Sequence, residues 1–477
     1  MSFLQKRNVY LLVLLFMLTN VLTFFGTTLY YKQQQVAVPP VDPTVESTEI
    51  EEELKPLVEA LDILSKRYLE DVSREELINA AISGMVESLG DPQTNFFTTS
   101  DYNEMMIKID GSFSGIGVEI SAVDDYITVV ETIKNTPGEK AGLLAGDRIV
   151  AVDGQSIVGV TPVEAAQMMR GPEGTKVTLT VERENIEKPL TFTIMRANIV
   201  VPSVFAEMLE GKIAYIQITT FDEHTGSDFQ KALLELEAQG MRGLILDLRD
   251  NPGGLLDQAV KIGQEILPAG PITHMVDREG NLLQTYQSYG TEKNYPIVVL
   301  INGNSASASE IIAGALQDTG TAILVGTKTY GKATVQHLEA LSNQSGIRYT
   351  VAKYQTPKGR DIHGQGLEPD VQVELTEDYF VLRHGIITEL KPGDEGANVL
   401  ILQKILRVLG YSVDATGKFD EVTVQAVRSF QEQHNLSVSG QVDLATRKEI
   451  NKQIESILPA KDLQLQKALE IIDSKIK

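Results

Sequence analysis

A serine and a glutamate near the middle of the chain have the spacing that places a hydroxyl at the start of a helix. Ser307 and Glu310 form a capping-box pattern, which predicts a helix that begins at Ala308 with Ser307 as its N-cap. The cap lies at the positive end of the helix dipole, beside main-chain N–H groups that can stabilise an anion on a bound carbonyl. Taken alone, the pattern is more typical of an ordinary helix start than of a nucleophile.

A lysine and a glutamine follow the serine at a spacing that suits a general base and its partner. Lys332 and Gln336 share one face of either a helix or a strand. A lysine acts as a base only if its pKa falls from about 10.4 toward about 7 or 8. That shift of roughly 3 units costs about 4 kcal/mol and requires burial or a nearby cation. A glutamine can orient the amine without adding charge. An exposed lysine and an exposed glutamine remain the common alternative.

The flanking segments are those needed to bring the serine and the lysine together. An apolar run over 297–301 predicts a buried strand, and Asn302-Gly303-Asn304 is a turn signal. A second short strand over 322–325 leads back toward Lys332. The sequence therefore predicts a strand, a serine at the mouth of a helix, and a lysine returned to that serine.

Four motifs in this region resemble the carboxyl-terminal processing proteases, also called tail-specific proteases. They are the segments 305–311, 314–318, 329–332 and 335–336. The resemblance implies a crotonase- and Clp-like α/β core in which Ser307 is the nucleophile, Lys332 the base and Gln336 the orienting residue. Ala333 stands where relatives usually carry glycine, and a residue this small is harmless unless its backbone is left-handed.

A glycine-rich turn follows the apolar strand predicted over 243–249. The resemblance implies that this turn supplies a main-chain oxyanion donor, assigned to Gly253 with Gly254 as the alternative, alongside the N–H of Ala308. The plainer interpretation is a strand-to-helix turn without a catalytic role. His363 is close enough in sequence to be considered as a base, but we assign it a structural role because Lys332 already fills the catalytic one.

Residues 111–196 combine strand patterns and tight turns that resemble a PDZ domain. Its carboxylate-binding loop aligns with Gly115, Ile116, Gly117 and Val118. In such loops main-chain N–H groups capture a peptide C-terminus while the peptide adds a strand to the sheet edge. Arg170 is a fifth candidate for the peptide-binding site, as a residue that reaches another domain, with a solvated surface arginine as the alternative.

Composition excludes several classes of function. The net charge of −23 argues against nucleic acid or anionic lipid as a main partner. The absence of cysteine excludes disulfides, a thiol nucleophile and thiolate metal sites. The 6 histidines show no metal-ligand spacing, so neither a metal nor another cofactor is expected.

The N-terminus carries a targeting signal. Lys6 and Arg7 precede an apolar run from about Val9 to Tyr30, which is long enough to cross a bilayer. The basic flank predicts a cytoplasmic N-terminus and an exported body at the cell membrane. No clear Ala-x-Ala site follows, which favours an uncleaved anchor over a removed signal peptide and a secreted body.

Helical patterns occupy both ends of the exported body. The first helix has an apolar face, and the second begins at Ser73, where Glu76 completes a capping box. The resemblance implies that these helices form a homodimer. From Lys391 the pattern resembles a three-helix peptidoglycan-binding domain, which either binds the cell wall or serves assembly. The amphipathic tail over 461–477 has an apolar face that could pack on a partner subunit.

The expected fold is a multidomain α/β chain. Its parts are an anchor (1–31), a tether (32–53), a helical segment (54–110), a PDZ domain (111–196), a serine protease core (197–390), a peptidoglycan-binding-like domain (391–452) and a helical tail (453–477). The expected function is an exported endopeptidase that recognises C-terminal tails of protein substrates, including signalling proteins of sporulation or envelope proteins.

Two other functions remain open. One is a catalytically silent PDZ scaffold at the cell wall, because the sequence does not show that the candidate side chains meet. The other is a Ser-His-Asp protease, but those place the catalytic module before the PDZ domain and surround the serine with Gly-Asn-Ser-Gly-Gly. Neither feature occurs in this chain.

Overall fold

The structure is a computed structural model, and it describes residues 47–476 apart from 124, 185 and 387. The predicted anchor lies outside these residues, as does most of the predicted tether. Within the described part of the chain, no helix is both long and apolar enough to cross a membrane. The described residues divide into two compact units, one comprising 47–96 with Ile347–Val351 and the other comprising the remaining described residues.

The first unit contains a helical hairpin, α2 (Ser47–Arg67) and α3 (Arg74–Glu87). The predicted capping box is present, because the Ser73 N–H donates to Glu76 Oε2 at 2.8 Å and the Glu76 N–H donates to Ser73 Oγ at 3.1 Å. Many apolar side chains of the hairpin are exposed, namely Leu54, Leu57, Val58, Ile63, Leu64, Tyr68, Leu69, Ile78, Met85 and Leu89.

The second unit begins with α4 (Thr99–Asp110), followed by a PDZ-like segment. The strands of its main sheet follow the order β3-β4-β5-β7-β8, so β3 lies at an edge. The elements are β2 (Ser112–Gly115), β3 (Val118–Val123), β4 (Tyr126–Thr132), α5 (Pro137–Ala141), β5 (Arg148–Val152), β6 (Gln155–Ser156), α6 (Pro162–Met169), β7 (Lys176–Glu182), β8 (Leu190–Met195) and β9 (Ala197–Val200). Strand β9 pairs with β2 and closes the segment a few residues beyond the predicted boundary at 196.

The α/β core is built on a six-stranded sheet in the order β10-β11-β12-β15-β16-β19. Only β10 is antiparallel to its neighbour. The central strands are buried on both faces, which explains their continuous apolar runs. The bounds are β10 (Val204–Leu209), β11 (Ile213–Ile218), β12 (Gly243–Asp247), β15 (Ile297–Ile301), β16 (Ala322–Gly326) and β19 (Val371–Gln372), with the short helix η1 (Glu210–Lys212) between the first two strands.

A second sheet contains β1 (Asn95–Phe97), β18 (Gly346–Gln355), β13 (Gly270–Val276) and β14 (Leu282–Ser288), with β17 (Thr334–Ala340) paired to β18.

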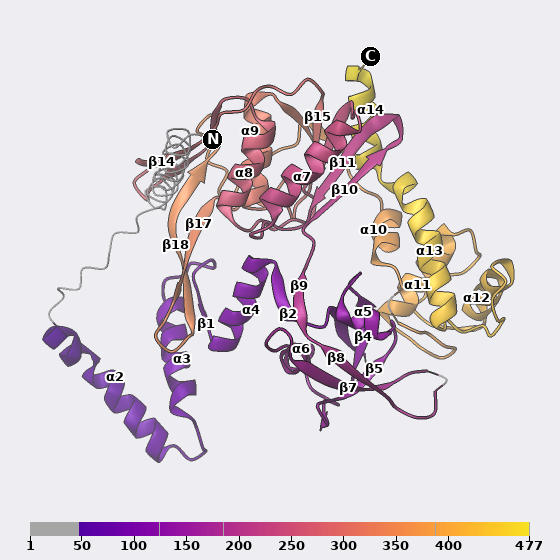
Figure 1. Cartoon of the computed structure of the whole chain (residues 1–477), viewed down its shortest axis with the longest axis horizontal. Coiled ribbons are helices and arrows are strands. Elements are labelled where there is room, and N and C mark those ends of the chain that lie inside the picture. The colour runs from indigo at the N-terminus through magenta and orange to yellow at the C-terminus, as the bar shows by residue number, and fades with distance from the viewer. Residues whose placement is uncertain (1–46, 124, 185, 387, 477) are drawn as a thin grey trace, which may run out of the picture. The chain divides into compact units, whose positions relative to one another are not determined.

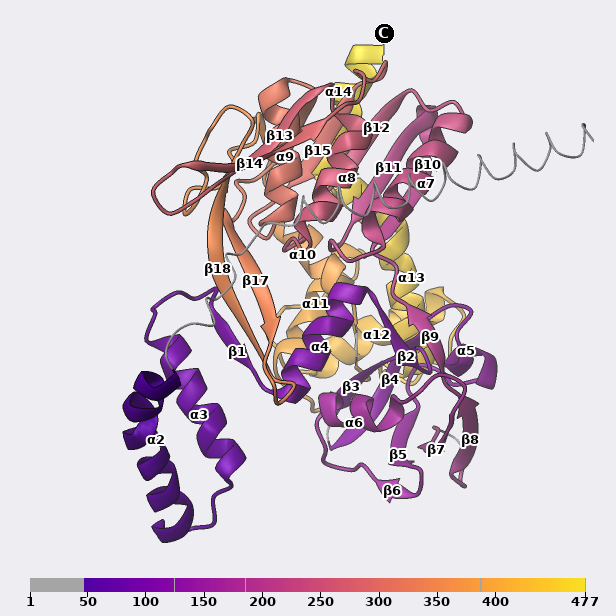
Figure 2. The same cartoon turned by 60° about the vertical axis from the view of Figure 1, so that its left-hand side comes forward.

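Three helices pack together on one face of the six-stranded sheet (Figure 1, Figure 2). They are α7 (Thr225–Ala238), α8 (Leu256–Ile266) and α9 (Ala308–Thr319).

The opposite face of the six-stranded sheet is covered by the C-terminal helix α14 (Leu463–Ile476). Ala468 and Ile472 of α14 are fully buried against Ile245, Val298 and Val325 of the sheet. The apolar face of α14 therefore completes the core of its own chain, although its sequence pattern was also compatible with packing on a partner subunit.

The remaining helices form a separate small core. They are α10 (Glu377–His384), α11 (Ala397–Val408), α12 (Glu421–Gln433) and α13 (Leu444–Lys461). Leu382 of α10 belongs to this core, so the helical module begins before the predicted boundary at 391. The structure confirms the expected multidomain α/β class with a PDZ-like segment, an α/β core and C-terminal helices.

Candidate active site

Ser307 occupies a sharp turn between a strand and a helix. Strand β15 ends at Ile301, and helix α9 begins at Ala308 with Ser307 as its N-cap, as the sequence predicted. The Ser307 backbone has φ 55° and ψ −114°, a conformation that side chains other than glycine rarely adopt. Such strain costs about 1–3 kcal/mol and persists only where surrounding contacts hold it.

Of the three serines in the motif, only Ser307 has an accessible side chain. Ser305 is fully buried, and its hydroxyl donates to the Leu248 carbonyl at 2.7 Å. Ser309 is also fully buried and donates to the Asn251 carbonyl at 3.0 Å. Ser307 is half-buried. The accessible hydroxyl of this motif is therefore the one chosen from the capping pattern.

The buried carboxylate of Glu310 holds the main chains of the serine and the lysine. Glu310 Oε2 accepts the Ser307 N–H at 2.9 Å and the Lys332 N–H at 2.8 Å. Glu310 Oε1 accepts the Gly331 N–H at 2.7 Å and the Thr329 hydroxyl at 2.5 Å. Sequence reasoning identified only the capping contact, because the other donors come from a distant loop.

A second bridge between the same main chains comes from Tyr354 on β18, which sequence reasoning missed. Its hydroxyl lies 3.0 Å from the Ser307 carbonyl oxygen and 2.6 Å from the Lys332 carbonyl oxygen. Burial, together with the nearby Glu310 carboxylate, raises the pKa of Tyr354 well above its usual value. The phenol therefore stays protonated and acts as a donor at neutral pH.

Lys332 immediately precedes β17, and Gln336 lies within that strand. The Gln336 amide donates to Thr334 Oγ1 at 2.8 Å, so a threonine that the sequence analysis did not single out fixes its orientation. Ala333 is fully buried and does not have a positive φ, so the expected tolerance of alanine at this position holds. His363 is exposed, and its Nδ1 accepts the Ala333 N–H at 3.4 Å.

The glycine-rich turn after β12 lies directly against the nucleophile. A Cβ placed on Gly253 would lie 2.7 Å from the Ser307 Cβ and 3.0 Å from the Ala308 nitrogen. The Gly253 N–H donates to Asn251 Oδ1 at 2.9 Å. The glycine-rich turn and the start of α9 therefore lie close together beside Ser307, and the N–H of Gly253 already has an acceptor in Asn251.

The five predicted peptide-binding residues line one cleft of the PDZ-like segment. They are Gly115, Ile116, Gly117, Val118 and Arg170, joined by Phe113, Ile120, Ala166 and Met169. The cleft runs between the edge strand β3 and helix α6, which is where an added peptide strand would lie. The Arg170 guanidinium forms an ion pair with Glu104 of α4 and lies 5.1 Å from the Phe113 ring centroid.

Comparison with protein-family models finds a PDZ domain, a peptidase and a peptidoglycan binding domain, in the order expected from the sequence. Residues 212–373 match peptidase family S41, residues 128–183 match the PDZ domain, and residues 395–450 match a peptidoglycan binding domain. Residues 16–100 match the activating protease CtpB N-terminal domain.

Three curated relatives are similar over most of their length. The chain is 35% identical over 447 residues to carboxy-terminal processing protease CtpB of Bacillus subtilis, covering 92% of both chains. It is 34% identical to CtpA of the same organism, covering 87% of this chain and 89% of CtpA. Identity to a carboxy-terminal-processing protease of Bartonella bacilliformis is 41%, covering 66% and 74% of the two chains. The chain therefore belongs to the carboxy-terminal processing serine proteases of peptidase family S41.

Proposed function

We propose that Ser307 is the nucleophile of this protease and that Lys332 is its general base. The observation that carries the assignment is the pair of bridges through Glu310 and Tyr354, which join the main chains of these two residues. The accessibility of Ser307, in contrast to Ser305 and Ser309, gives independent support.

The reaction proceeds through an acyl-enzyme. Uncharged Lys332 Nζ accepts the Ser307 proton while Ser307 Oγ bonds to the substrate carbonyl carbon, and the carbonyl oxygen becomes an oxyanion. The C–N bond then breaks, and the Lys332 ammonium gives its proton to the leaving amine. Lys332 next takes a proton from water, whose oxygen attacks the ester carbonyl carbon. The bond from that carbon to Ser307 Oγ then breaks, the Lys332 ammonium returns its proton to Oγ, and the product leaves as a carboxylic acid that ionises in solvent. Gln336 orients the lysine amine.

The oxyanion is stabilised by main-chain donors on either side of Ser307. The Ala308 N–H lies at the N-terminus of α9, where the helix dipole favours negative charge. Gly253 can donate only if its bond to Asn251 opens, and Gly254 supplies the next N–H of the same turn.

Substitution of the two principal residues tests this mechanism. Cleavage of an unfolded reporter protein is expected to vanish in Ser307→Ala and in Lys332→Ala, with unchanged circular dichroism. Full activity of either folded variant would contradict the assignment.

The PDZ cleft binds the free C-terminus of the protein substrate. Its position beside an edge strand favours a peptide that adds to β3, and its apolar lining favours an apolar terminal side chain. Titration of a labelled peptide that ends in a free apolar carboxylate tests this role. The same peptide with an amidated C-terminus is expected to bind much more weakly, and equal affinities would contradict it.

The N-terminal segment anchors the protease to the cell membrane, with the body exported. The basic residues before the apolar run support this orientation. The substrates are accordingly exported signalling or envelope proteins, including sporulation signalling proteins. Protease protection of intact cells or spheroplasts tests the topology, because an external protease should digest the body and spare the N-terminus.

The helical hairpin forms a homodimer. Its exposed apolar side chains, for example Leu57 at 46% and Leu69 at 95%, resemble an interface rather than a solvated surface. Light scattering is expected to give twice the chain mass, and Leu57→Glu with Leu64→Glu is expected to give monomers. If the double variant keeps the dimer mass, the interface between subunits lies outside the helical hairpin.

The helical module binds peptidoglycan. Its match to a peptidoglycan binding domain supports this role. The chain is expected to sediment with purified cell-wall sacculi. A chain that remains in the supernatant would favour a role in assembly.

A further inference from the structure

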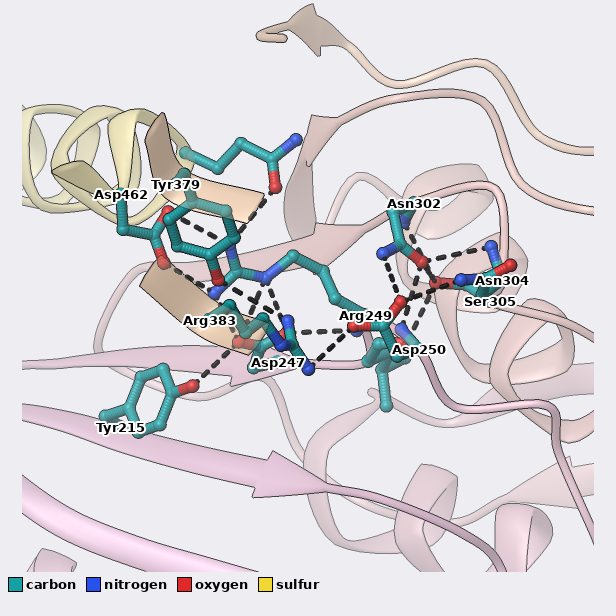
Figure 3. A network of polar contacts seen from close by, with 12 residues as sticks. Tyr215, Asp247, Arg249, Asp250, Asn302, Asn304, Ser305, Tyr379, Arg383 and Asp462 are labelled. Carbon is teal, nitrogen blue, oxygen red and sulfur yellow. Dashed lines mark hydrogen bonds and ion pairs between the residues drawn. The ribbon is translucent and has the colours of Figure 1, made fainter. Parts of the chain in front are cut away.

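A buried ion cluster ties the C-terminal helices to the strand that leads into the oxyanion turn. Arg249 is only 4% exposed, and its guanidinium is held by Asp247 on its own strand end, with the closest contact at 2.6 Å. From the junction of α13 and α14, Asp462 Oδ1 and Oδ2 each accept an Arg249 N–H at 2.9 Å. Gln464 Oε1 accepts another at 3.1 Å (Figure 3).

Asp250, the next residue in the chain, is held by a different set of partners, the asparagines of the 302–304 turn and Arg383 of α10. Asp250 has φ 57°, and its N–H donates to Asn302 Oδ1 at 3.0 Å. Its carboxylate accepts the side-chain amides of Asn302 and Asn304 at 2.8 and 2.9 Å and pairs with Arg383 at 2.7 Å. Figure 3 shows the Arg249 side chain running toward Asp462 and Tyr379, away from Asp250 and the two asparagines.

Both anchors therefore belong to the connections of the helical module. Arg383 lies on α10, through which the chain enters the module, and Asp462 lies where the chain leaves it. They contact two consecutive residues, Arg249, which directly precedes the turn, and Asp250, which begins it. An uncommon backbone conformation such as that of Asp250 persists only where neighbouring contacts over-determine it.

We propose that Asp462 and Arg383 are positioning residues for catalysis. By holding Arg249 and Asp250, the C-terminal helices keep the turn over 250–254 aimed at Ser307. This proposal rests on the assignment of that turn to the oxyanion site. Neither residue touches the reacting atoms, so their effect is on how well the turn fits the tetrahedral intermediate.

Asp462→Asn in the purified full-length chain tests the proposal. The amide keeps the shape of the carboxylate but turns an N–H toward the guanidinium. Since a misplacement of about 1 Å can cost on the order of 100-fold in rate, we expect kcat on a fluorogenic peptide to fall by about 30-fold with KM within about twofold. Asp473→Asn, at an exposed position of the neighbouring helix α14, is the matched control and is expected to leave kcat unchanged.

A transition-state analogue separates positioning from a purely structural role. A peptidyl boronate forms a tetrahedral adduct on Ser307 and places an oxygen in the oxyanion site. Its inhibition constant is expected to rise by about the same factor as kcat falls, because both depend on the same donors. An unchanged constant with an unchanged kcat would overturn the proposal.

Arg383→Gln keeps the test decisive if Asp462→Asn does not fold, because the Arg383 side chain is 41% exposed and its loss leaves the buried cluster intact. A fall in kcat with unchanged KM, and recovery of most of it in Arg383→Lys, is expected. A wild-type kcat in Arg383→Gln would show that Arg383 does not position the turn.

The two proposals fail in different ways. If Ser307→Ala cleaves the peptide, the proposed function is wrong. If Ser307→Ala is inactive while folded Asp462→Asn and Arg383→Gln have the kcat of wild type, only the positioning proposal is wrong.

Discussion

Ser307 and Lys332 share one hydrogen-bond acceptor, Glu310 Oε2, which lies 2.9 Å from the first main-chain nitrogen and 2.8 Å from the second. The Tyr354 hydroxyl joins their carbonyl groups from the other side. The relative position of nucleophile and base is therefore fixed through the backbone, by two side chains that need not take part in the chemistry.

Glu310→Gln is expected to lower the free energy of unfolding and to abolish most of the activity. The amide offers one acceptor oxygen where the carboxylate offers two, so at least one of the donors from Ser307, Lys332 and Gly331 loses its partner. A buried polar group without a partner costs about 1–3 kcal/mol. Urea denaturation measures the loss, with Glu432→Gln on an exposed face of α12 as the control. Equal stability of wild type and Glu310→Gln would contradict the bridge.

Ser307→Gly is expected to be more stable than Ser307→Ala by about 1–2 kcal/mol. Both variants lack the hydroxyl, but glycine has no Cβ and adopts φ 55° without a steric clash, whereas the Cβ of alanine is strained at this φ. Thermal unfolding of the two inactive variants gives the difference directly. A more stable alanine variant would show that Ser307 is not strained.

Tyr354→Phe is expected to change how stability depends on pH. The folded pKa of Tyr354 is raised above the unfolded value of about 10, so the phenol's contribution to stability is complete below pH 10 and is lost as pH rises further. One proton difference changes the free energy of unfolding by about 1.4 kcal/mol per pH unit.

Denaturation between pH 9 and 11.5 checks this sign. The decline above pH 10 should be less steep in Tyr354→Phe than in wild type, and the variant should also be less active at neutral pH. Parallel curves for the two proteins would indicate that the Tyr354 phenol ionises freely in the folded state.

Gly117→Ala is expected to block peptide binding to the PDZ cleft. Gly117 has φ 73°, and an added Cβ would lie 2.4 Å from the Thr136 Cβ. Gly154 has φ 83° with open space around it, so Gly154→Ala carries the same backbone strain without the collision. Fluorescence anisotropy with a C-terminal peptide should show a large loss of affinity for Gly117→Ala only. Similar affinities for both variants would place the peptide elsewhere.

The sequence was sufficient for the elements that follow local rules. The capping pattern located the start of α9 at Ser307, and the apolar runs located the buried strands β12 and β15. The residues that complete the site were missed because their contacts are distant in sequence. Tyr354 looks like an ordinary strand aromatic, and nothing local to Asp462 indicates that it meets Arg249.

The partner of the C-terminal helix could not be predicted for a related reason. An amphipathic pattern shows that one face of a helix is buried but does not show what covers it. Ala468 and Ile472 therefore fitted a subunit interface as well as the core sheet of the same chain.

Covalent labelling with a peptidyl phosphonate, followed by intact-mass measurement and peptide mapping, tests most directly whether Ser307 is the nucleophile and Lys332 its base. We expect one adduct per chain, located on Ser307, with none in Ser307→Ala. Labelling of Lys332→Ala should be slower by about 100-fold or more, because a positioned general base contributes about 10² to 10⁴ in rate. An adduct on another residue, or labelling of Lys332→Ala at the wild-type rate, would contradict the Ser/Lys assignment.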